Sequence, residues 1–350
     1  MGINDAWINA KDYPTIQAAI DALPAAGGVV IVPPGDYDEN TTPAMSALTL
    51  PTRTILCGSG IHATKLLYNA DAGSAISMQS SNSSLRDFSI VGPGTGSVAK
   101  GIVVGKPGET LSNILLDNVA VVDVPECGLY FMGGEVPGGT NVIQCSVRSS
   151  HFQGVVATTG ANLRIGTWCT TIAFADCGFG LTRGYDAELN GPVGTTFDRC
   201  VFETGTYDNQ ALVKGSLLGS THFNNCWFET HGNLTHYCVD VTTAVGLHLR
   251  DCYLARDTGN AARLLNLSGN CRDIVVESPT IFTKTAPTAT DDIVMDVAYD
   301  ANNELTVIGG WKNYGNDYLN WPISVVAGSN YATDASHQLF YYKGGSWHAI

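Results

Sequence analysis

The sequence predicts an all-β fold in which short parallel strands coil into a β-helix, and the main evidence is an internal repeat. Three stretches align at one constant offset: "TTFDRCVFETG" from Thr195, "THFNNCWFETHG" from Thr221 and "LHLRDCYLARDTG" from Leu247. A second row of short apolar runs lies between them, bounded by Gly, Ser, Asn and Asp as strands commonly are. No stretch with a helical period lies between these runs, which excludes βαβ units. The alternative fold is a β-sandwich of antiparallel strands, but a sandwich would not require the constant period that the sequence shows.

The N-terminal segment predicts a helical cap, because the open sheet edge at the end of a coil must be covered. In "YPTIQAAIDALPAAGG", Ile16, Ile20 and Leu23 lie at helical spacing, so we expect an amphipathic α-helix there. The stretch "GVVIVPPGDY" that follows predicts a buried strand, which its two prolines end.

The extent of the repeat divides the chain into three regions. We expect residues 1–49 to form the N-terminal cap, 50–310 to form about nine coils, and 311–350 to form a C-terminal cap or trimerisation segment. The final stretch, "QLFYYKGGSWHAI", predicts a hairpin that turns at Gly344–Gly345.

Composition narrows the classes of partner. Charged residues make up 14 % of the chain and the formal net charge is −14. Nucleic acid is therefore not an expected partner, because its phosphates require clustered Lys and Arg. No apolar run reaches the length of a membrane span, so membrane insertion is not expected. The first residues lack the basic and apolar pattern of a signal peptide, so we expect either that a signal has been removed or that the protein leaves the cell by another route.

The cysteines are predicted to be free thiols. Cys200, Cys226 and Cys252 are evenly spaced at the offset of the repeat, and Cys145 and Cys177 lie in similar local contexts. Single cysteines repeated in this way are typical of small buried hydrophobic residues in equivalent positions. The chain has no CxxC pair, and we predict neither a metal site nor a cofactor.

The stretch "TIQAAIDALPAAGGVVIVPPGDYDE" resembles the opening of the pectate-lyase-like superfamily, in which a helix and a "VPPGxY" strand cap the first coil. The resemblance implies a right-handed, single-stranded parallel β-helix with a saccharide groove along one face. That superfamily includes lyases, esterases, hydrolases, epimerases and phage tailspikes, so the reaction does not follow from the fold. The aromatic C-terminal segment is similar in character to the ends of phage tailspike and receptor-binding proteins, in which three chains often associate.

An outward column of side chains predicts a saccharide site. If Cys226 faces the core, then Trp227 and Glu229 point outward on alternate positions, and Tyr253 repeats the aromatic position one coil later. Glu203 and Glu229 are then one coil apart, with backbones separated by about 4.8 Å. Two carboxylates at this spacing suit the acid and nucleophile of a retaining glycosidase, and an aromatic ring beside them suits stacking on a sugar.

Other residues extend or rival this site. His222 and His248 lie near the same coils and are predicted to bind substrate or relay protons. A rival outward column in the second row is formed by Lys214, Asp240, Asn266 and Asp296. Asp240 is the member that we predict as a catalytic carboxylate, in the manner of the lyases and hydrolases of the resembled superfamily.

Three functions remain open. The first is a phage tailspike-like, homotrimeric receptor-binding protein, located in the virion tail or outside the cell, that recognises a cell-surface polysaccharide with or without depolymerising it. The second is a secreted polysaccharide lyase or glycoside hydrolase, which requires a signal peptide in the full gene. The third is a structural or adhesive β-helix without catalysis. A polysaccharide or oligosaccharide is the expected partner in the first two.

Overall fold

The computed structural model of the chain consists of two compact units, Met1–Gly184 and Tyr185–Ile350. It describes residues 6–94, 98–135, 139–155, 157–203, 211–230, 237–256, 263–283, 293–296 and 305–309, and the backbone of further strands between 311 and 349. Both units are parallel β-solenoids, which confirms the predicted fold class. The boundaries of the three predicted regions stay a prediction.

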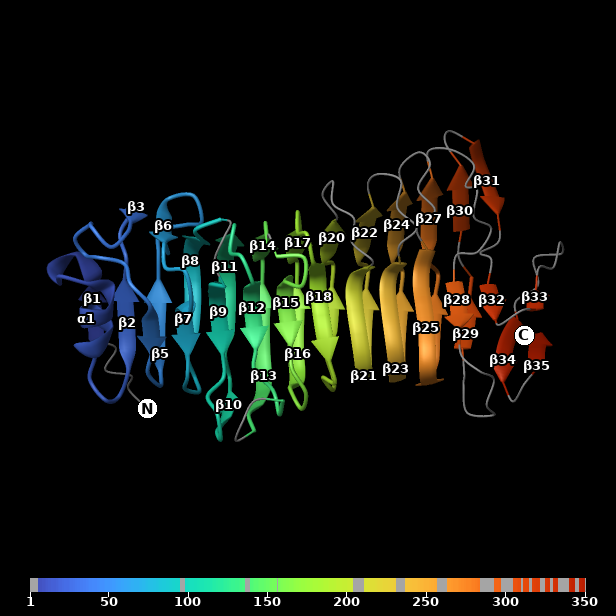
Figure 1. Cartoon of the computed structure of the whole chain (residues 1–350), viewed down its shortest axis with the longest axis horizontal. Coiled ribbons are helices and arrows are strands. Elements are labelled where there is room, and N and C mark those ends of the chain that lie inside the picture. Colours follow the sequence, from blue (N-terminus) through green and yellow to red (C-terminus); the bar gives the residue numbers. More distant parts are fainter. Residues whose placement is uncertain are drawn as a thin grey trace. The chain divides into compact units, whose positions relative to one another are not determined.

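The strands of the first unit stack in three parallel ladders, drawn from blue to green in Figure 1. The first ladder contains β1 (Ala6–Asn9), β2 (Gly28–Ile31), β5 (Thr54–Cys57), β8 (Ser84–Val91), β11 (Leu115–Val122), β13 (Asn141–Arg148) and β16 (Thr170–Ala175), with β10 (Thr110–Ser112) beside the start of β13. The second contains β3 (Gly35–Tyr37), β6 (Thr64–Leu67), the ends of β8 and β11, β14 (His151–Gln153) and β17 (Gly178–Gly180). The third contains β4 (Leu48–Leu50), β7 (Ser74–Met78), β9 (Lys100–Val104), β12 (Cys127–Phe131) and β15 (Ala161–Ile165).

The second unit repeats the three ladders with longer, merged strands. Its first ladder contains β19 (Thr196–Asp198), the ends of β21 (Ala211–Asn224) and β23 (Tyr237–Arg250), β26 (Ile274–Glu277) and β29 (Leu305–Ile308). Its second contains β20 (Val201–Glu203), β22 (Trp227–Thr230), β24 (Tyr253–Arg256), β27 (Thr280–Thr283) and β30 (Trp311–Tyr314). Its third contains β18 (Tyr185–Asn190), the starts of β21, β23 and β25 (Arg263–Arg272), β28 (Ile293–Asp296) and β32 (Val325–Ala327).

The chain ends in antiparallel strands. They are β31 (Asp317–Trp321), β33 (Asn330–Ala332), β34 (Phe340–Lys343) and β35 (Ser346–Ala349). β34 pairs with β35 as the predicted terminal hairpin requires, whereas the turn expected at Gly344–Gly345 lies outside the described residues.

The N-terminal helix is shorter than predicted. α1 (Ile16–Asp21) follows a 3-10 turn, η1 (Ala10–Asp12), and begins where the Thr15 hydroxyl accepts a hydrogen bond of 2.9 Å from the Ala18 N–H. Ile16 and Ile20 are buried as expected, but Leu23 lies beyond the end of the helix. The sequence interpretation missed β1, which pairs with β2 in parallel. The cap is therefore a strand and a short helix together, since β1 covers the β2 edge.

A bend separates the first ladder from the second. In the second unit this bend is formed by four residues with positive φ, namely Arg199, Asn225, Asp251 and Ser278. An L-residue in this left-handed conformation costs about 1–2 kcal/mol, least for Asn and Asp, because their short side chains tolerate it. The bend ends one strand and starts the next, and so it sets which side chains point inward.

In the core, side chains of the same type lie above one another in neighbouring coils. Phe202 and Phe228 stack with ring centroids 5.2 Å apart, and Phe223 stacks on Phe197 at 4.8 Å. All ten cysteines are free, which confirms the prediction made for the five repeated ones, and Cys226 in the middle of its column is fully buried. Burial also raises the pKa of such thiols, because it disfavours the charged thiolate.

Candidate functional site

An aromatic pair, Trp227 and Tyr253, lies on the outer surface of the second ladder of the second unit. β22 and β24 place these two residues in register, and their rings stack with centroids 4.1 Å apart and planes 19° apart. Trp227 is 38 % exposed although it is large and apolar, so the predicted outward orientation is confirmed. We call these two residues the aromatic pair.

Glu229 fixes the orientation of the indole. Its Oε2 accepts a hydrogen bond of 2.9 Å from Trp227 Nε1. Burial raises the pKa of the Tyr253 phenol, and the charge of Glu229 adds to that effect. Glu229 therefore lies close to both rings and acts on them directly.

Glu203 stands one coil before Glu229. β20 and β22 pair so that Val201 is opposite Trp227 and Glu203 is opposite Glu229, as the repeat predicts. Tyr253 covers one face of the indole, and Val201 is the neighbour in register on the other side. Val201 is 38 % exposed and its side chain is smaller than the indole, so the surface is lower at Val201 than at Trp227. Glu203 lies two residues further along the same strand.

The two histidines meet on the first ladder of the same unit. β21 and β23 place His222 opposite His248, and their ring centroids are 4.7 Å apart. They belong to a pocket of about 170 Å³, whose lining consists of His222, Asn224, His248, Leu249, Arg250, Val275 and Glu277. Burial lowers the pKa of His222, and the neighbouring His248 and Arg250 lower it further. We call this the histidine pocket.

Asp240 lies on the third ladder, apart from both groups. Its Oδ1 accepts a hydrogen bond of 2.7 Å from the Asn266 amide, and Lys214 is opposite it in register. The Lys214 ammonium lies 5.1 Å from the centre of the Tyr185 ring. The rival column was wrong in one place, because Asp296 is in register with Ser268 and Asn266 is opposite Val294. The coil from β25 to β28 is longer than the preceding coils of this unit, which shifts the residues that pair. The alternation of side chains within one strand cannot reveal such a shift.

The predicted site residues therefore form three groups rather than one. The aromatic pair with its glutamates, the histidine pocket and Asp240 occupy the second, first and third ladders of the unit. Bends at Asn225 and Asp251 separate the first two groups. A ligand that reached both would have to pass around that bend.

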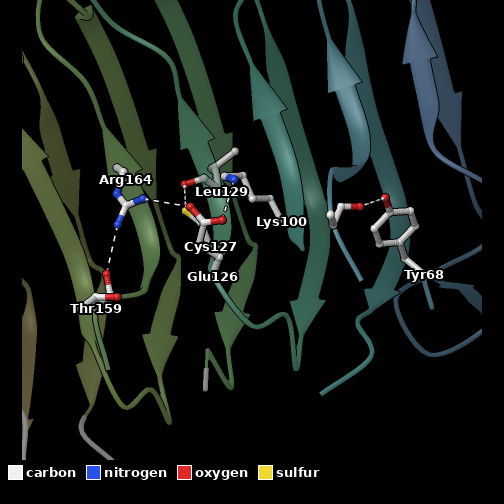
Figure 2. Close-up of polar contacts among 8 residues, drawn as sticks. Tyr68, Lys100, Glu126, Cys127, Leu129, Thr159 and Arg164 are labelled. Atoms are coloured by element: carbon white, nitrogen blue, oxygen red, sulfur yellow. Dashed lines mark hydrogen bonds and ion pairs between the residues drawn. The ribbon is translucent and has the colours of Figure 1, made fainter. Parts of the chain in front are cut away.

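The sequence interpretation missed a charged row in the first unit, shown in Figure 2. Lys100 Nζ lies 2.6 Å from Glu126 Oε2, and Arg164 Nη1 lies 3.6 Å from Glu126 Oε1. Arg164 also donates to the Thr159 carbonyl at 3.2 Å. These side chains come from three successive coils of unequal length, so no constant period reveals them.

Tyr130 extends this row. Its hydroxyl donates to Glu135 Oε1 at 3.0 Å, while Glu135 Oε2 accepts from the Thr167 N–H and hydroxyl at 2.8 Å each. Burial and the adjacent Glu135 raise the pKa of Tyr130 far above its ordinary value. The phenol therefore stays protonated, and the arrangement is that of a structural network rather than of a general base.

Two further findings concern the described residues alone. Within them, no three His, Cys, Asp or Glu side chains gather closely enough to hold a metal ion. No helix in this part of the chain is long and apolar enough to cross a membrane.

Comparison with known proteins supports the fold. No known family profile and no curated protein sequence matches the chain. Among solved structures, the A-module of the Azotobacter vinelandii mannuronan C-5 epimerase AlgE4 is 16 % identical, with a TM-score of 0.55 over 92 % of this chain and 100 % of that one. PfbA, a surface adhesin of Streptococcus pneumoniae, is 13 % identical, with a TM-score of 0.58 over 99 % and 98 %. The gp42 tailspike of Acinetobacter phage vb_AbaP_AS12 is 10 % identical, with a TM-score of 0.56 over 96 % and 68 %. These structures share the β-helix fold, which confirms the resemblance at that level.

Proposed function

We propose that this chain binds a polysaccharide on the outer face of the second ladder, with one sugar ring stacked on Trp227 above Val201. The observation that supports it is an exposed indole whose far face rests on Tyr253 and whose N–H is held by Glu229. A ring held in place in this way loses little freedom on binding, so less of the stacking energy is spent on ordering it. A mannuronan epimerase and a phage tailspike are among the structural neighbours, which is consistent with a saccharide ligand.

The finer proposal is a tailspike-like protein that attaches a phage to its host as a homotrimer. A phage tailspike is one of the solved structures with this fold, and the aromatic C-terminal segment is a candidate trimer contact. Light scattering at micromolar protein measures the mass directly. A mass of one chain, 37.0 kDa, would contradict the trimer and leave the binding proposal untouched.

Depolymerisation is the second candidate, and the register of Glu203 with Glu229 favours it. In a retaining glycosidase one carboxyl group protonates the leaving oxygen and the other attacks the sugar, from positions about 5 Å apart. We assign Glu203 as one of these two groups and Glu229, whose Oε2 accepts the hydrogen bond of the indole, as the other. Asp240 remains a proposed catalytic carboxylate of the third ladder only if both glutamates prove dispensable.

Substitution of the indole tests binding. Trp227→Ala should weaken binding to a polysaccharide array about tenfold or more, because stacking on an aromatic ring is lost while an outward side chain contributes little to the core. Trp7→Ala is the matched control, since Trp7 is 67 % exposed and lies in the first unit. Equal binding by both variants would place the saccharide site elsewhere.

Substitution of the carboxylates separates a binder from an enzyme. Glu203→Gln should abolish any release of reducing ends while binding is retained, and Glu229→Gln should do the same, because the Gln side-chain oxygen can still accept the hydrogen bond of the indole. Cleavage at the parental rate by Glu203→Gln would eliminate the glycosidase candidate.

A further inference from the structure

We infer that the histidine pocket binds the carboxylate of an acidic saccharide, and that this binding strengthens as the pH falls. The inference deepens the proposed function, since it names a carboxylate substituent of the sugar, which an aromatic stacking surface does not distinguish. It depends on the proposed function only in that the carboxylate belongs to a saccharide.

The pocket brings hydrogen-bond donors together on two strands. His222 of β21 and His248 of β23 lie with ring centroids 4.7 Å apart, and Arg250 lies two residues beyond His248 on the same face. The Arg250 Nε is engaged by Glu277 Oε2 at 2.6 Å. A guanidinium carries five N–H donors, so four remain, and they are unused within the described part of the chain. A planar carboxylate is the group that such a fork binds best.

The size of the pocket suits a substituent of one sugar rather than several linked sugars. Its volume of about 170 Å³ corresponds to roughly five or six water molecules at about 30 Å³ each. That space admits a carboxylate and part of the ring that carries it. A metal ion is a poor occupant, because no group of three or more metal-binding side chains gathers in the described residues.

The charges around His222 are nearly balanced when its imidazole is neutral. Arg250 of β23 is paired with Glu277 of β26, and Asp273, at the bend before β26, has Oδ2 3.8 Å from His248 Nε2. On the other side, Asp198 of β19 is paired with the adjacent Arg199. With both imidazoles neutral these groups sum to one negative charge, so protonation of one imidazole makes the pocket neutral, and protonation of both gives it a net positive charge that an anion would neutralise.

The pH dependence follows from the free protein. Burial, then the nearby His248 and Arg250, lower the pKa of His222, so its imidazole is neutral near pH 7. A bound carboxylate would favour the charged form and raise that pKa, so binding would take up a proton. Affinity would then rise as the pH falls from about 7.5 to about 5, a range in which a sugar carboxylate stays ionised. One unit of pKa change corresponds to a tenfold change in affinity.

Nuclear magnetic resonance of the histidine side chains tests the inference on the full chain. Sodium glucuronate is the acidic probe and methyl glucoside the neutral one, each titrated at about pH 5 and about pH 7.5. We expect saturable shifts of the His222 and His248 imidazole signals with glucuronate only, with affinity about tenfold higher at the lower pH. Loss of the signal in His222→Gln and in His248→Gln identifies each resonance.

Three variants separate the contributions. Arg250→Gln should weaken glucuronate binding at both pH values, whereas His222→Gln should remove the pH dependence. Arg148→Gln removes an arginine of the first unit that is likewise paired with a carboxylate, that of Asp117, and it is the matched control, for which we expect parental binding. Equal shifts with methyl glucoside, a pH-independent affinity of the parent, or an equal loss in Arg148→Gln would each overturn the inference.

The same experiments distinguish this inference from the proposed function. Glucuronate shifts at the two histidines, together with polysaccharide binding that Trp227→Ala does not alter, would sustain the pocket and refute the aromatic pair as the saccharide surface. Polysaccharide binding lost in Trp227→Ala, without histidine shifts, would sustain the aromatic pair and refute the pocket.

Discussion

The two units build one fold from coils of different regularity. In the second unit, consecutive partners such as Glu188, Lys214 and Asp240 follow one another at a constant spacing, and the same spacing holds for Val201, Trp227 and Tyr253 in another ladder. In the first unit the spacing between partners varies, since it is shorter from Gly28 to Thr54 than from Cys127 to Ala161. Equal coils keep one position of the repeat above itself in the next coil, whereas unequal coils bring together positions that no fixed period relates.

This difference determines what each unit can present on its surface. In the second unit it aligns Trp227 with Tyr253 and His222 with His248, which produces stacked pairs of like side chains. In the first unit the extra residues form excursions, and one of them carries Glu135 to the Thr167 amide. A repeated surface suits a repeating polymer, while the charged row of the first unit chiefly joins its own coils.

The aromatic core of the second unit should show the largest effect on stability. Phe223 is buried between three rings, with Phe197, Phe202 and Phe228 at centroid distances of 4.8, 5.9 and 5.9 Å. Phe223→Ala should lower the free energy of unfolding by about 3–5 kcal/mol, because the cavity cannot close within a stack of fixed coils. Urea unfolding followed by fluorescence measures it.

The first unit provides the matched variant for that prediction. Phe152 is equally buried and stacks on Phe179 at 5.6 Å. Phe152→Ala should fall at the lower end of the same range, because fewer aromatic rings surround the cavity. A smaller loss in Phe223→Ala than in Phe152→Ala would contradict the view that regular stacking concentrates stability in the second unit.

The bend between ladders should show the next largest effect. Asn225 and Asn118 have φ angles of 51° and 53°. Asn225 makes no side-chain hydrogen bond within the described residues, so Asn225→Gly should be close to neutral and Asn225→Ala should cost about 1 kcal/mol. Asn118 Nδ2 donates to Asp87 Oδ1 at 2.7 Å, so Asn118→Gly should lose about 1 kcal/mol with that bond.

Thermal unfolding of these variants compares the two bends directly. Equal stability of Asn118→Gly and Asn225→Gly would show that the side-chain bond in the first unit contributes nothing. A stable Asn225→Ala would show that the left-handed conformation is not maintained at the bend of the second unit.

Regularity also explains which features could be predicted from the sequence. The constant period revealed the parallel coils, the free cysteines, and the outward positions of Trp227 and Glu229, because each follows from counting residues. It placed Asp296 in the wrong column, because the spacing from β25 to β28 departs from that period. The row of Lys100, Glu126 and Arg164 was missed for the same physical reason: its members meet only after coils of unequal length are closed.

That charged row should have a moderate effect on stability. Glu126 is 30 % exposed and lies between Lys100 and Arg164, which are 25 % and 20 % exposed. Glu126→Gln should lower the free energy of unfolding by about 1 kcal/mol, since two partly buried cations lose their shared partner. Chemical denaturation with urea, which adds no salt, measures the change.

An exposed ion pair of the same unit is the control. Lys106 and Glu109 are 45 % and 50 % exposed, so Glu109→Gln should change the stability by less than about 0.5 kcal/mol. Equal effects of the two substitutions would mean that the charged row behaves as an ordinary surface pair.

The smallest expected effect is a pH dependence confined to the excursion that carries Glu135. Burial alone would raise the pKa of this carboxyl group, but hydrogen bonds from its own backbone and from Thr167 outweigh it and hold the pKa below 4.5. A group whose pKa is depressed by folding stabilises the folded state above its unfolded pKa and loses that contribution as the pH falls through the folded value.

The Thr167 N–H, which donates to Glu135 Oε2 at 2.8 Å, should therefore lose protection from hydrogen exchange as the pH falls below about 4.5. Mass spectrometry of the Thr167 peptide, corrected for the intrinsic exchange rate, detects this, and Glu135→Gln should give a pH-independent rate. Protection that persists in the parent at low pH would show that the excursion is held by its backbone rather than by the carboxylate.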